Sequence, residues 1–215
     1  AGLSVLDIGC GCGQNSLAFA RRGAKQVVAV DLSERMLAAA RAESAHPRIL
    51  YRRMDMEDLS ALTGPFDLVY SSLAFHYAAD FPHLIEEIHR LLRPGGILLF
   101  SQEHPIVTAT LGLRGRHNLD EQGRPVSYTF SDYAAAGRRS GPWLGEDVEN
   151  YHRPMGHIVT ALAQAGFLIQ AVVEPVRTPE AAAQLPALKK EFIKPTFLLI
   201  RAKRLDGNDA LQEVF

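Results

Sequence analysis

The sequence predicts an α/β fold, in which a doubly wound and mostly parallel sheet carries helices on both faces. Short apolar runs of strand length recur along the chain, and segments with helical apolar spacing separate them. The first apolar run leads through a glycine-rich turn into a helix. The chain has 215 residues, 47% of them hydrophobic, which is enough for a single domain over 1–215 with a full core. We expect about seven strands in one sheet.

Strands and helices alternate through the first half of the chain. Apolar runs bounded by turn residues predict strands at 5–8, 26–31, 49–54, 66–72 and 97–101. Helical spacing predicts helices from residue 17, over 33–45 and over 81–92. Ser33 has the position and the side chain of a helix N-cap. This alternation is typical of parallel strands that are joined by helices.

The second half differs, because its apolar periodicity fails from about residue 103 to residue 152. A stretch of that length without expected elements is unusual in a compact domain and is typical of a lid or a binding segment. We therefore expect an insertion over the substrate site at about 103–152. The elements expected after it are a helix over 155–165 and two strands that suit an antiparallel pair, over 167–174 and 197–202.

The glycine-rich turn has the pattern D-x-G-x-G-x-G, formed by Asp7, Gly9, Gly11 and Gly13. Glycine lets the chain turn sharply and lets backbone amides approach a ligand, and the start of the helix adds free N–H groups. The dinucleotide fingerprint G-x-G-x-x-G needs a third glycine where this chain has Gln14. A carboxylate at Asp7 repels a pyrophosphate and suits an ammonium group. The pattern therefore favours an amino acid carried on a nucleoside over a dinucleotide.

A second acid, Asp31, ends the next predicted strand, about 20 residues past the glycines. An acid at this place accepts hydrogen bonds from ribose hydroxyls and repels a 2′-phosphate. Capping the following helix is the other role open to Asp31, but Ser33 is better placed for it. We therefore predict that Asp31 binds a ribose.

Together these motifs resemble the class I S-adenosylmethionine (SAM) dependent methyltransferases, a family with a Rossmann-like fold and an antiparallel last strand. Phe-Asp-Leu-Val at 66–69 and Leu-Leu-Arg-Pro-Gly-Gly at 91–96 strengthen the resemblance. It implies that Asp7 and the three glycines hold the methionine part of the cofactor and that Asp31 holds its ribose. It also implies cofactor contacts from Leu32, Met36, Asp55, Met56, Ser71 and His76.

Two of these contacts concern the adenine. In the resembled family, an acid after the third strand accepts a hydrogen bond from the adenine amino group, and the next residue lies beside the ring. Asp55 and Met56 match those two places. The other interpretation of 55–58 is a solvated acidic turn, which is a common structure.

The resemblance implies methyl transfer from SAM to a small molecule, with S-adenosylhomocysteine as product. Among relatives, the chain looks closest to the ubiquinone and menaquinone biosynthesis methyltransferases, but the insertion departs from them, so a quinone precursor does not follow. Histidine can act as a general base near neutral pH. Two histidines lie in segments that should border the methyl group, His104 after the fifth strand and His152 at the end of the insertion. We predict that one of them is the base, if transfer needs one.

Two other functions stay open. One is a nicotinamide-dependent oxidoreductase on a similar sheet, against which Gln14 in the glycine pattern argues. The other is a SAM-binding protein that senses the cofactor or supports a partner subunit without catalysis.

Composition and charge argue against a nucleic-acid binder and against a chain that crosses a membrane. The formal net charge of −1 lacks the basic excess of a nucleic-acid binder, and the apolar runs are far too short to cross a bilayer. Cys10 and Cys12 are too few for a structural zinc site and favour a cytoplasmic protein. The chain begins at Ala1 without an initiator Met, and the resembled family usually has helices before the first strand, so we expect a preceding segment.

Overall fold

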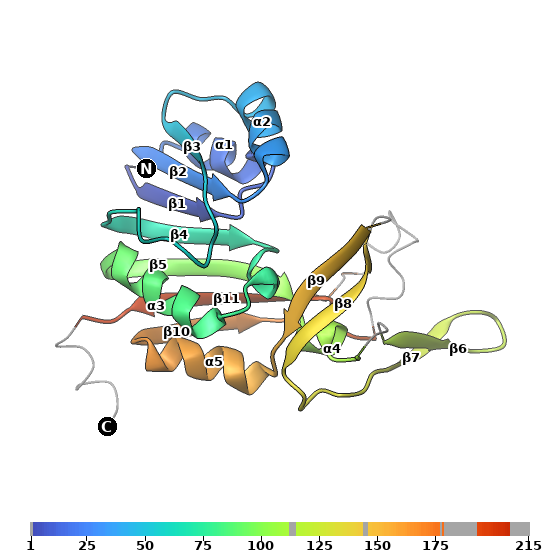
Figure 1. Ribbon diagram of the computed structural model, residues 1–215. Helices are drawn as coiled ribbons and strands as arrows, with labels where there is room; N and C mark the ends of the chain where they lie inside the picture. Colours follow the sequence, from blue (N-terminus) through green and yellow to red (C-terminus); the bar gives the residue numbers. More distant parts are fainter. Residues whose placement is uncertain (1, 112–114, 144–145, 177, 179–192, 207–215) are drawn as a thin grey trace.

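The fold is a central sheet with helices packed against it (Figure 1). The computed structural model describes residues 2–111, 115–143, 146–176, 178 and 193–206. Within these residues, seven strands form one sheet in the order β10-β11-β5-β4-β1-β2-β3. In chain order they are β1 (Ser4–Ile8), β2 (Gln26–Asp31), β3 (Ile49–Arg53), β4 (Phe66–Ser72), β5 (Leu92–Glu103), β10 (Phe167–Val173) and β11 (Phe197–Arg204).

The strand order and directions match the prediction. β1 pairs in parallel with β2 on one side and with β4 on the other, and β3 and β5 extend the parallel set outward. The chain order therefore reverses between β1 and β4, and sheets of this kind bind ligands at the carboxyl ends beside that point. β11 is antiparallel to both β5 and β10. The doubly wound sheet and its antiparallel last strand are both confirmed.

Two apolar clusters hold the layers together. The helices are α1 (Gln14–Arg21), α2 (Glu34–Glu43), α3 (Phe81–Leu91), the short α4 (Pro105–Thr108) and α5 (Met155–Gln164), with a 3-10 turn η1 (Phe75–Tyr77). One cluster buries α1 and α2 against β1 and β2, and the larger cluster joins α3 and α5 to the sheet. Ser33 caps α2 as predicted, because its hydroxyl oxygen accepts a hydrogen bond from the Met36 amide at 3.3 Å.

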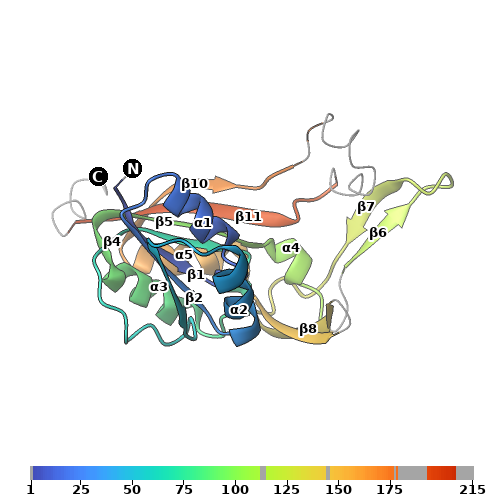
Figure 2. The same cartoon turned by 90° about the horizontal axis from the view of Figure 1, so that it is seen from above.

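The insertion is more regular than the sequence predicts. After α4 the chain forms two antiparallel hairpins, β6 (Arg116–Leu119) with β7 (Pro125–Thr129) and β8 (Gly137–Trp143) with β9 (Glu146–His152). Figure 2 shows both hairpins and α4 beyond one end of the sheet, the end at which β4 and β5 finish in Figure 1. Strands such as β8 are rich in glycine and arginine and lack the alternation of apolar residues on which strand prediction depends.

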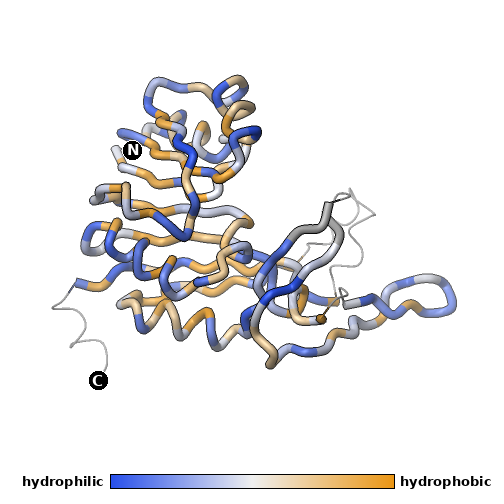
Figure 3. Tube along the Cα trace, in the orientation of Figure 1, coloured by the Kyte–Doolittle hydropathy of each residue, from blue (hydrophilic) through white to orange (hydrophobic). Residues whose placement is uncertain are grey.

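The sheet and the insertion differ in hydropathy. Apolar residues concentrate along the strands of the sheet, whereas the tip of the β6–β7 hairpin is hydrophilic (Figure 3). In the described part of the chain, no helix has the length and the apolar character needed to span a bilayer.

Candidate cofactor and acceptor site

The glycine loop between β1 and α1 uses its three glycines in different ways. Gly9, Gly11 and Gly13 have φ angles of 70°, 53° and 76°, a region that other residues rarely adopt. A Cβ on Gly9 would lie 2.5 Å from the Ala74 Cβ, and one on Gly13 would lie 2.3 Å from the Tyr51 hydroxyl. A Cβ on Gly11 would meet nothing within 4 Å. Packing therefore requires Gly9 and Gly13, whereas Gly11 borders open space that a ligand can enter.

The predicted ribose acid is fixed next to that space. The Gly11 amide donates a hydrogen bond to Asp31 Oδ2 at 2.8 Å, and the Ser33 amide donates one to Oδ1 at 2.9 Å. A carboxylate oxygen has two lone pairs, so each oxygen of Asp31 can accept another hydrogen bond. The carboxylate is therefore held in one orientation and keeps the capacity to bind two hydroxyls.

The first acid is buried at the end of β1. Asp7 is 1% exposed, and its Oδ2 accepts a hydrogen bond from the Ser16 hydroxyl at 2.5 Å. Burial raises the pKa of the Asp7 carboxyl to about 6, the bond from Ser16 opposes the rise and the charge of Asp31 adds to it. A buried carboxylate gains most from a cationic partner. An ammonium group, as predicted for the methionine part of the cofactor, is such a partner.

Exposed apolar side chains follow β2 and β4, the strands on either side of β1. Leu32 and Met36, both predicted cofactor contacts, are 58% and 37% exposed. Leu73 follows β4 and is 39% exposed, and hydrogen bonds from its amide to Ser101 hold it at a φ of 55°. No sequence pattern marks Leu73, because the left-handed region is unusual for a branched side chain. Apolar side chains beside fixed carboxylates suit a nucleoside, which has an apolar ring and a polar sugar.

The predicted adenine contacts fit both interpretations of their segment. Asp55 is exposed, and its Oδ1 accepts a hydrogen bond from the Glu57 amide at 3.0 Å, as in a solvated acidic turn. That turn uses one oxygen and leaves Oδ2 for an adenine amino group. Met56 is partly buried and packs against the larger apolar cluster. The adenine contacts of Asp55 and Met56 stay predictions.

Two further predicted cofactor residues, Ser71 and His76, make hydrogen bonds near the carboxyl ends of the strands. Ser71 is buried, and its hydroxyl donates a hydrogen bond to the Ile8 carbonyl at 2.8 Å, which ties β4 to β1. His76 in η1 is 4% exposed, and its Nδ1 accepts a hydrogen bond from the Glu103 amide at 3.3 Å. These bonds give both residues a structural role, and contact of either with the cofactor stays a prediction.

His104 is the N-cap of α4. Its Nδ1 accepts a hydrogen bond from the Ile106 amide at 3.1 Å. Its Nε2 lies 2.7 Å from Glu174 Oε1, so this nitrogen carries a proton and donates it to the carboxylate. Burial lowers the pKa of His104, although the bond to Glu174 acts in the opposite direction. The ring thus connects the end of β5 to the segment that follows β10.

His152, at the end of β9, is completely buried. Its Nε2 lies 2.9 Å from the Tyr133 carbonyl, which can only accept, so Nε2 carries the proton. Its Nδ1 lies 2.8 Å from the Thr108 hydroxyl and accepts the hydrogen bond from it. Burial lowers the pKa of this ring also. The two bonds fasten the β8–β9 hairpin to α4 and to the loop before β8.

Neither histidine has a lone pair to spare. A neutral imidazole accepts through one nitrogen only, and in both rings that nitrogen already accepts a hydrogen bond. A general base must reach its proton through such a lone pair. The arrangement speaks against His104 and His152 as bases, a role that stays a prediction, and it gives both a structural role that the sequence analysis did not foresee.

Arg153 links the end of the insertion to the segment between η1 and α3. It follows β9, donates hydrogen bonds to the carbonyls of Ala78 and Ala79 after η1, and lies over the Phe81 ring, 5.2 Å from its centre. Burial lowers the pKa of its guanidinium to about 10, and nearby carboxylates oppose the shift. An arginine in a polar stretch gives no sequence signal for contacts of this kind.

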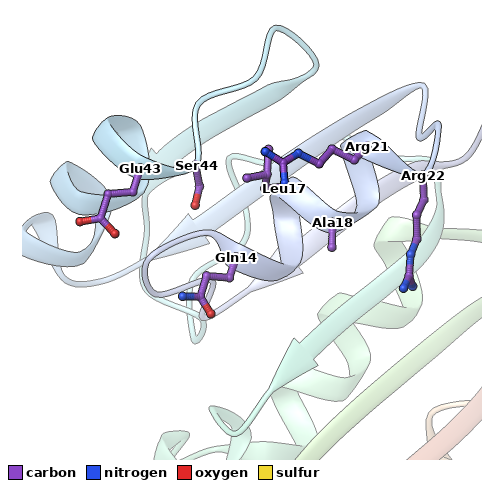
Figure 4. A pocket seen from close by; sticks show the side chains of 7 residues that line it. All are labelled: Gln14, Leu17, Ala18, Arg21, Arg22, Glu43 and Ser44. Atoms are coloured by element: carbon purple, nitrogen blue, oxygen red, sulfur yellow. The ribbon is translucent and has the colours of Figure 1, made fainter.

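A separate groove of about 440 Å³ lies between α1 and the end of α2 (Figure 4). It is lined by Gln14, Leu17, Ala18, Arg21, Arg22, Glu43 and Ser44. None of the predicted cofactor residues is among them, so we do not assign this groove to the cofactor.

Comparison with known proteins agrees with the geometry of the loop. Residues 5–96 match the family model described as a methyltransferase domain. The crystal structure of an S-adenosylmethionine dependent methyltransferase from Mesorhizobium loti is 38% identical, covers 95% of this chain and 92% of that chain, and has a TM-score of 0.87. An uncharacterised protein from Haemophilus influenzae is 34% identical over 216 residues, which are 95% of this chain and 82% of that protein.

A more distant relative has a named substrate. Trans-aconitate 2-methyltransferase from Deinococcus radiodurans is 28% identical over 214 residues, which are 96% of this chain and 73% of the relative. The matches decide against a nicotinamide-dependent oxidoreductase, and SAM is the cofactor. The chain belongs to the class I S-adenosylmethionine-dependent methyltransferases.

Proposed function

We propose that the protein transfers the methyl group of SAM to a small molecule that binds between the glycine loop and the β8–β9 hairpin. The observation that carries the proposal is the open space at Gly11, beside the Asp31 carboxylate, whose oxygens can still accept hydrogen bonds. The hairpins lie beyond the same end of the sheet (Figure 2). The relative from Deinococcus supports a small acceptor, because its alignment spans the insertion and its named substrate is a small molecule.

The residues of the loop fit the cofactor. Asp31 accepts hydrogen bonds from the ribose hydroxyls, and Asp7 accepts the ammonium group of the methionine part. Leu32 and Met36 cover the nucleoside, since both side chains are exposed beside Asp31. Asp55 receives the adenine amino group through the oxygen that its own turn does not use.

The chain contributes position more than proton transfer. SAM supplies a methyl group on a sulfonium, which is already an activated electrophile. What remains for the protein is to hold the acceptor atom in line with that methyl group and to exclude water. The β8–β9 hairpin is suited to this, because Arg153 and His152 fasten it at the end of the sheet. Since both histidines are fully bonded, we infer an acceptor atom that needs no strong base from them.

Calorimetry and a transfer screen test the proposal. We expect SAM and S-adenosylhomocysteine to bind and NAD not to bind. Candidate acceptors are then screened for tritium transfer from methyl-labelled SAM, and the panel includes trans-aconitate and quinone precursors. Transfer to one small molecule supports the proposal. Binding of SAM without transfer to any acceptor, with a closed surface over the sulfonium in a cofactor-bound crystal, would favour a non-enzymatic SAM-binding protein instead.

A further inference from the structure

Gln102, near the end of β5, has a buried polar atom with no hydrogen-bond partner among the residues that the structure describes. Its side chain is 3% exposed, and its Oε1 has no hydrogen-bond partner. Buried polar atoms are almost always paired in folded proteins, because an unpaired one loses its bonds to water without replacement. Each exception therefore needs an explanation, and a ligand or an ordered water is the usual one. Among the described residues the other unpaired buried side-chain atom is Arg204 Nε.

Gln102 lies at the end of a row of buried apolar side chains. Side chains alternate along a strand, so Gln102 lies on the face of β5 that carries Leu98 and Phe100. Both of these are completely or nearly completely buried, and Phe100 packs against Phe75 of η1 with ring centres 5.0 Å apart. An apolar side chain would thus suit this row, and packing alone does not account for an amide at its end.

The end of β5 contacts both η1 and the insertion. The residue after Gln102, Glu103, donates its amide hydrogen to His76 of η1 and accepts a hydrogen bond from the Asn150 side chain of β9 at 3.0 Å. η1 follows β4, the strand beside the glycine loop, and β9 belongs to the insertion. Gln102 comes one residue before this junction, and its side chain is on the face of β5 against which Phe75 of η1 packs. We place the proposed acceptor site at this junction.

We propose that Gln102 Oε1 accepts a hydrogen bond from the methyl acceptor and so selects acceptors that carry an O–H or N–H group. The inference rests on the proposed function. It assigns Gln102 a part in acceptor binding and none in cofactor binding, since the two carboxylates that fit SAM lie at the ends of β1 and β2. An acceptor without such a donor leaves the oxygen buried and unpaired, and is disfavoured for that reason.

The test compares Gln102→Met, which keeps the length of the side chain without its oxygen, with Leu98→Met as a control on the same face of the strand. Removal of an unpaired polar atom is expected to raise the Tm of Gln102→Met by about 2–4 °C, whereas the control shows no rise. Calorimetry with S-adenosylhomocysteine is run on both variants first and should give affinities within twofold of wild type. If wild type and both variants fail to bind, the proposed function is wrong, whereas a loss confined to Gln102→Met would contradict the assignment of Gln102 to the acceptor.

The acceptor side is probed by NMR on the complex with S-adenosylhomocysteine, with phenol as an O–H donor and anisole as its methylated counterpart. We expect phenol to shift the side-chain amide signals of Gln102 and anisole not to shift them. Phenol should bind Gln102→Met at least fivefold more weakly than wild type. Equal shifts with both probes, or no shift with phenol, would overturn the inference. A lower Tm for Gln102→Met would also overturn it, because the oxygen would then bind a structural water that the fold needs.

Discussion

The glycine loop and the insertion both fix polar side chains by hydrogen bonds at one end of the sheet, but these side chains differ in their remaining capacity to bind. Asp31 holds two backbone amides, one on each oxygen, and both oxygens can still accept a hydrogen bond. His152 also makes two hydrogen bonds, one on each nitrogen, and has no lone pair left. The difference follows from two lone pairs on a carboxylate oxygen and one on an imidazole nitrogen. Asp31 in the loop can therefore still bind a ligand, whereas His104 and His152 use their hydrogen bonds to hold the insertion against the rest of the domain.

Gly11→Ala should have the largest effect on the cofactor side of this comparison. The new Cβ would point into open space at a φ of 53°, where the backbone is expected to approach SAM. We expect SAM affinity to fall roughly 100-fold, about 2.7 kcal/mol, by calorimetry. Gly123→Ala is the matched control, because Gly123 in the turn between β6 and β7 has a φ of 74° and equally open surroundings. An equal loss of affinity in the control would show that backbone strain, and not the loop, causes the effect.

His152→Ala tests the insertion side. It leaves the Tyr133 carbonyl without its partner and leaves the Thr108 hydroxyl only a 3.4 Å hydrogen bond to the Pro105 carbonyl, so denaturant unfolding should show a loss of about 2–4 kcal/mol. SAM affinity should stay within twofold of wild type. His157→Ala, at an exposed position on α5, is the control and should change stability by less than about 0.5 kcal/mol. A variant of unchanged stability whose transfer rate falls 100-fold would restore His152 as a general base.

Asp31→Ala should weaken SAM binding by about 1–3 kcal/mol, because the ribose hydroxyls lose a charge-assisted partner and Gly11 loses its anchor. The fold should survive, since Asp31 is at a strand tip. Calorimetry on the folded variant measures the effect. Unchanged affinity would remove Asp31 from the cofactor site.

The pH dependence of SAM binding tests Asp7. Its pKa of about 6 in the fold lies above its ordinary value, so the carboxyl is protonated below pH 6 and cannot pair with an ammonium group. SAM affinity should therefore fall about tenfold from pH 7 to pH 5 and change little above pH 7. Ser16→Ala removes a bond that lowers this pKa, so the midpoint should move to higher pH.

The raised pKa of Asp7 also affects the stability of the fold, and this effect changes with pH in the opposite direction to SAM affinity. Between pH 3.8 and about 6 the folded protein binds a proton on Asp7 that the unfolded chain does not, so this group lowers stability as pH rises through that window. Asp7→Asn should flatten both curves. A variant that keeps the full pH dependence of SAM binding would show that another group titrates.

Met36→Ala should have the smallest effect. Met36 is 37% exposed, and cofactor binding would cover part of that surface, so affinity should fall by about 0.5–1 kcal/mol, or roughly two- to fivefold. Leu119→Ala, at an exposed leucine of β6, should leave SAM affinity unchanged by calorimetry. Equal effects of the two changes would place the nucleoside elsewhere.

The fold could be predicted because its signals are local. The fourth strand has its predicted bounds, 66–72, since turn residues and an apolar run mark both ends. β5 starts at Leu92, five residues before the predicted strand, because Leu92 already pairs with Phe66 of β4. The hairpins of the insertion were missed, because backbone pairing of short polar strands leaves no periodic pattern.

The site could be predicted only where its parts are close in sequence. Asp7 and the glycines share one loop, so their spacing carries the chemistry. The histidines do not behave in this way, because Thr108 is 44 residues from His152 and Glu174 is 70 residues from His104. A sequence shows that a histidine can act as a base, but it does not show which distant groups already occupy its nitrogens. The unpaired oxygen of Gln102 is hidden for the same reason.

The most direct test of the comparison is the state of the histidine nitrogens in solution. Two-bond ¹H–¹⁵N NMR spectra of the wild-type protein, with and without S-adenosylhomocysteine, report the tautomer and the charge of each ring. The structure predicts that the neutral rings of His104 and His152 carry the proton on Nε2 and that both rings titrate below the ordinary pKa of histidine. If either ring frees a nitrogen when S-adenosylhomocysteine binds, or titrates near its ordinary pKa of about 6.5, the insertion supplies a base and the comparison is wrong.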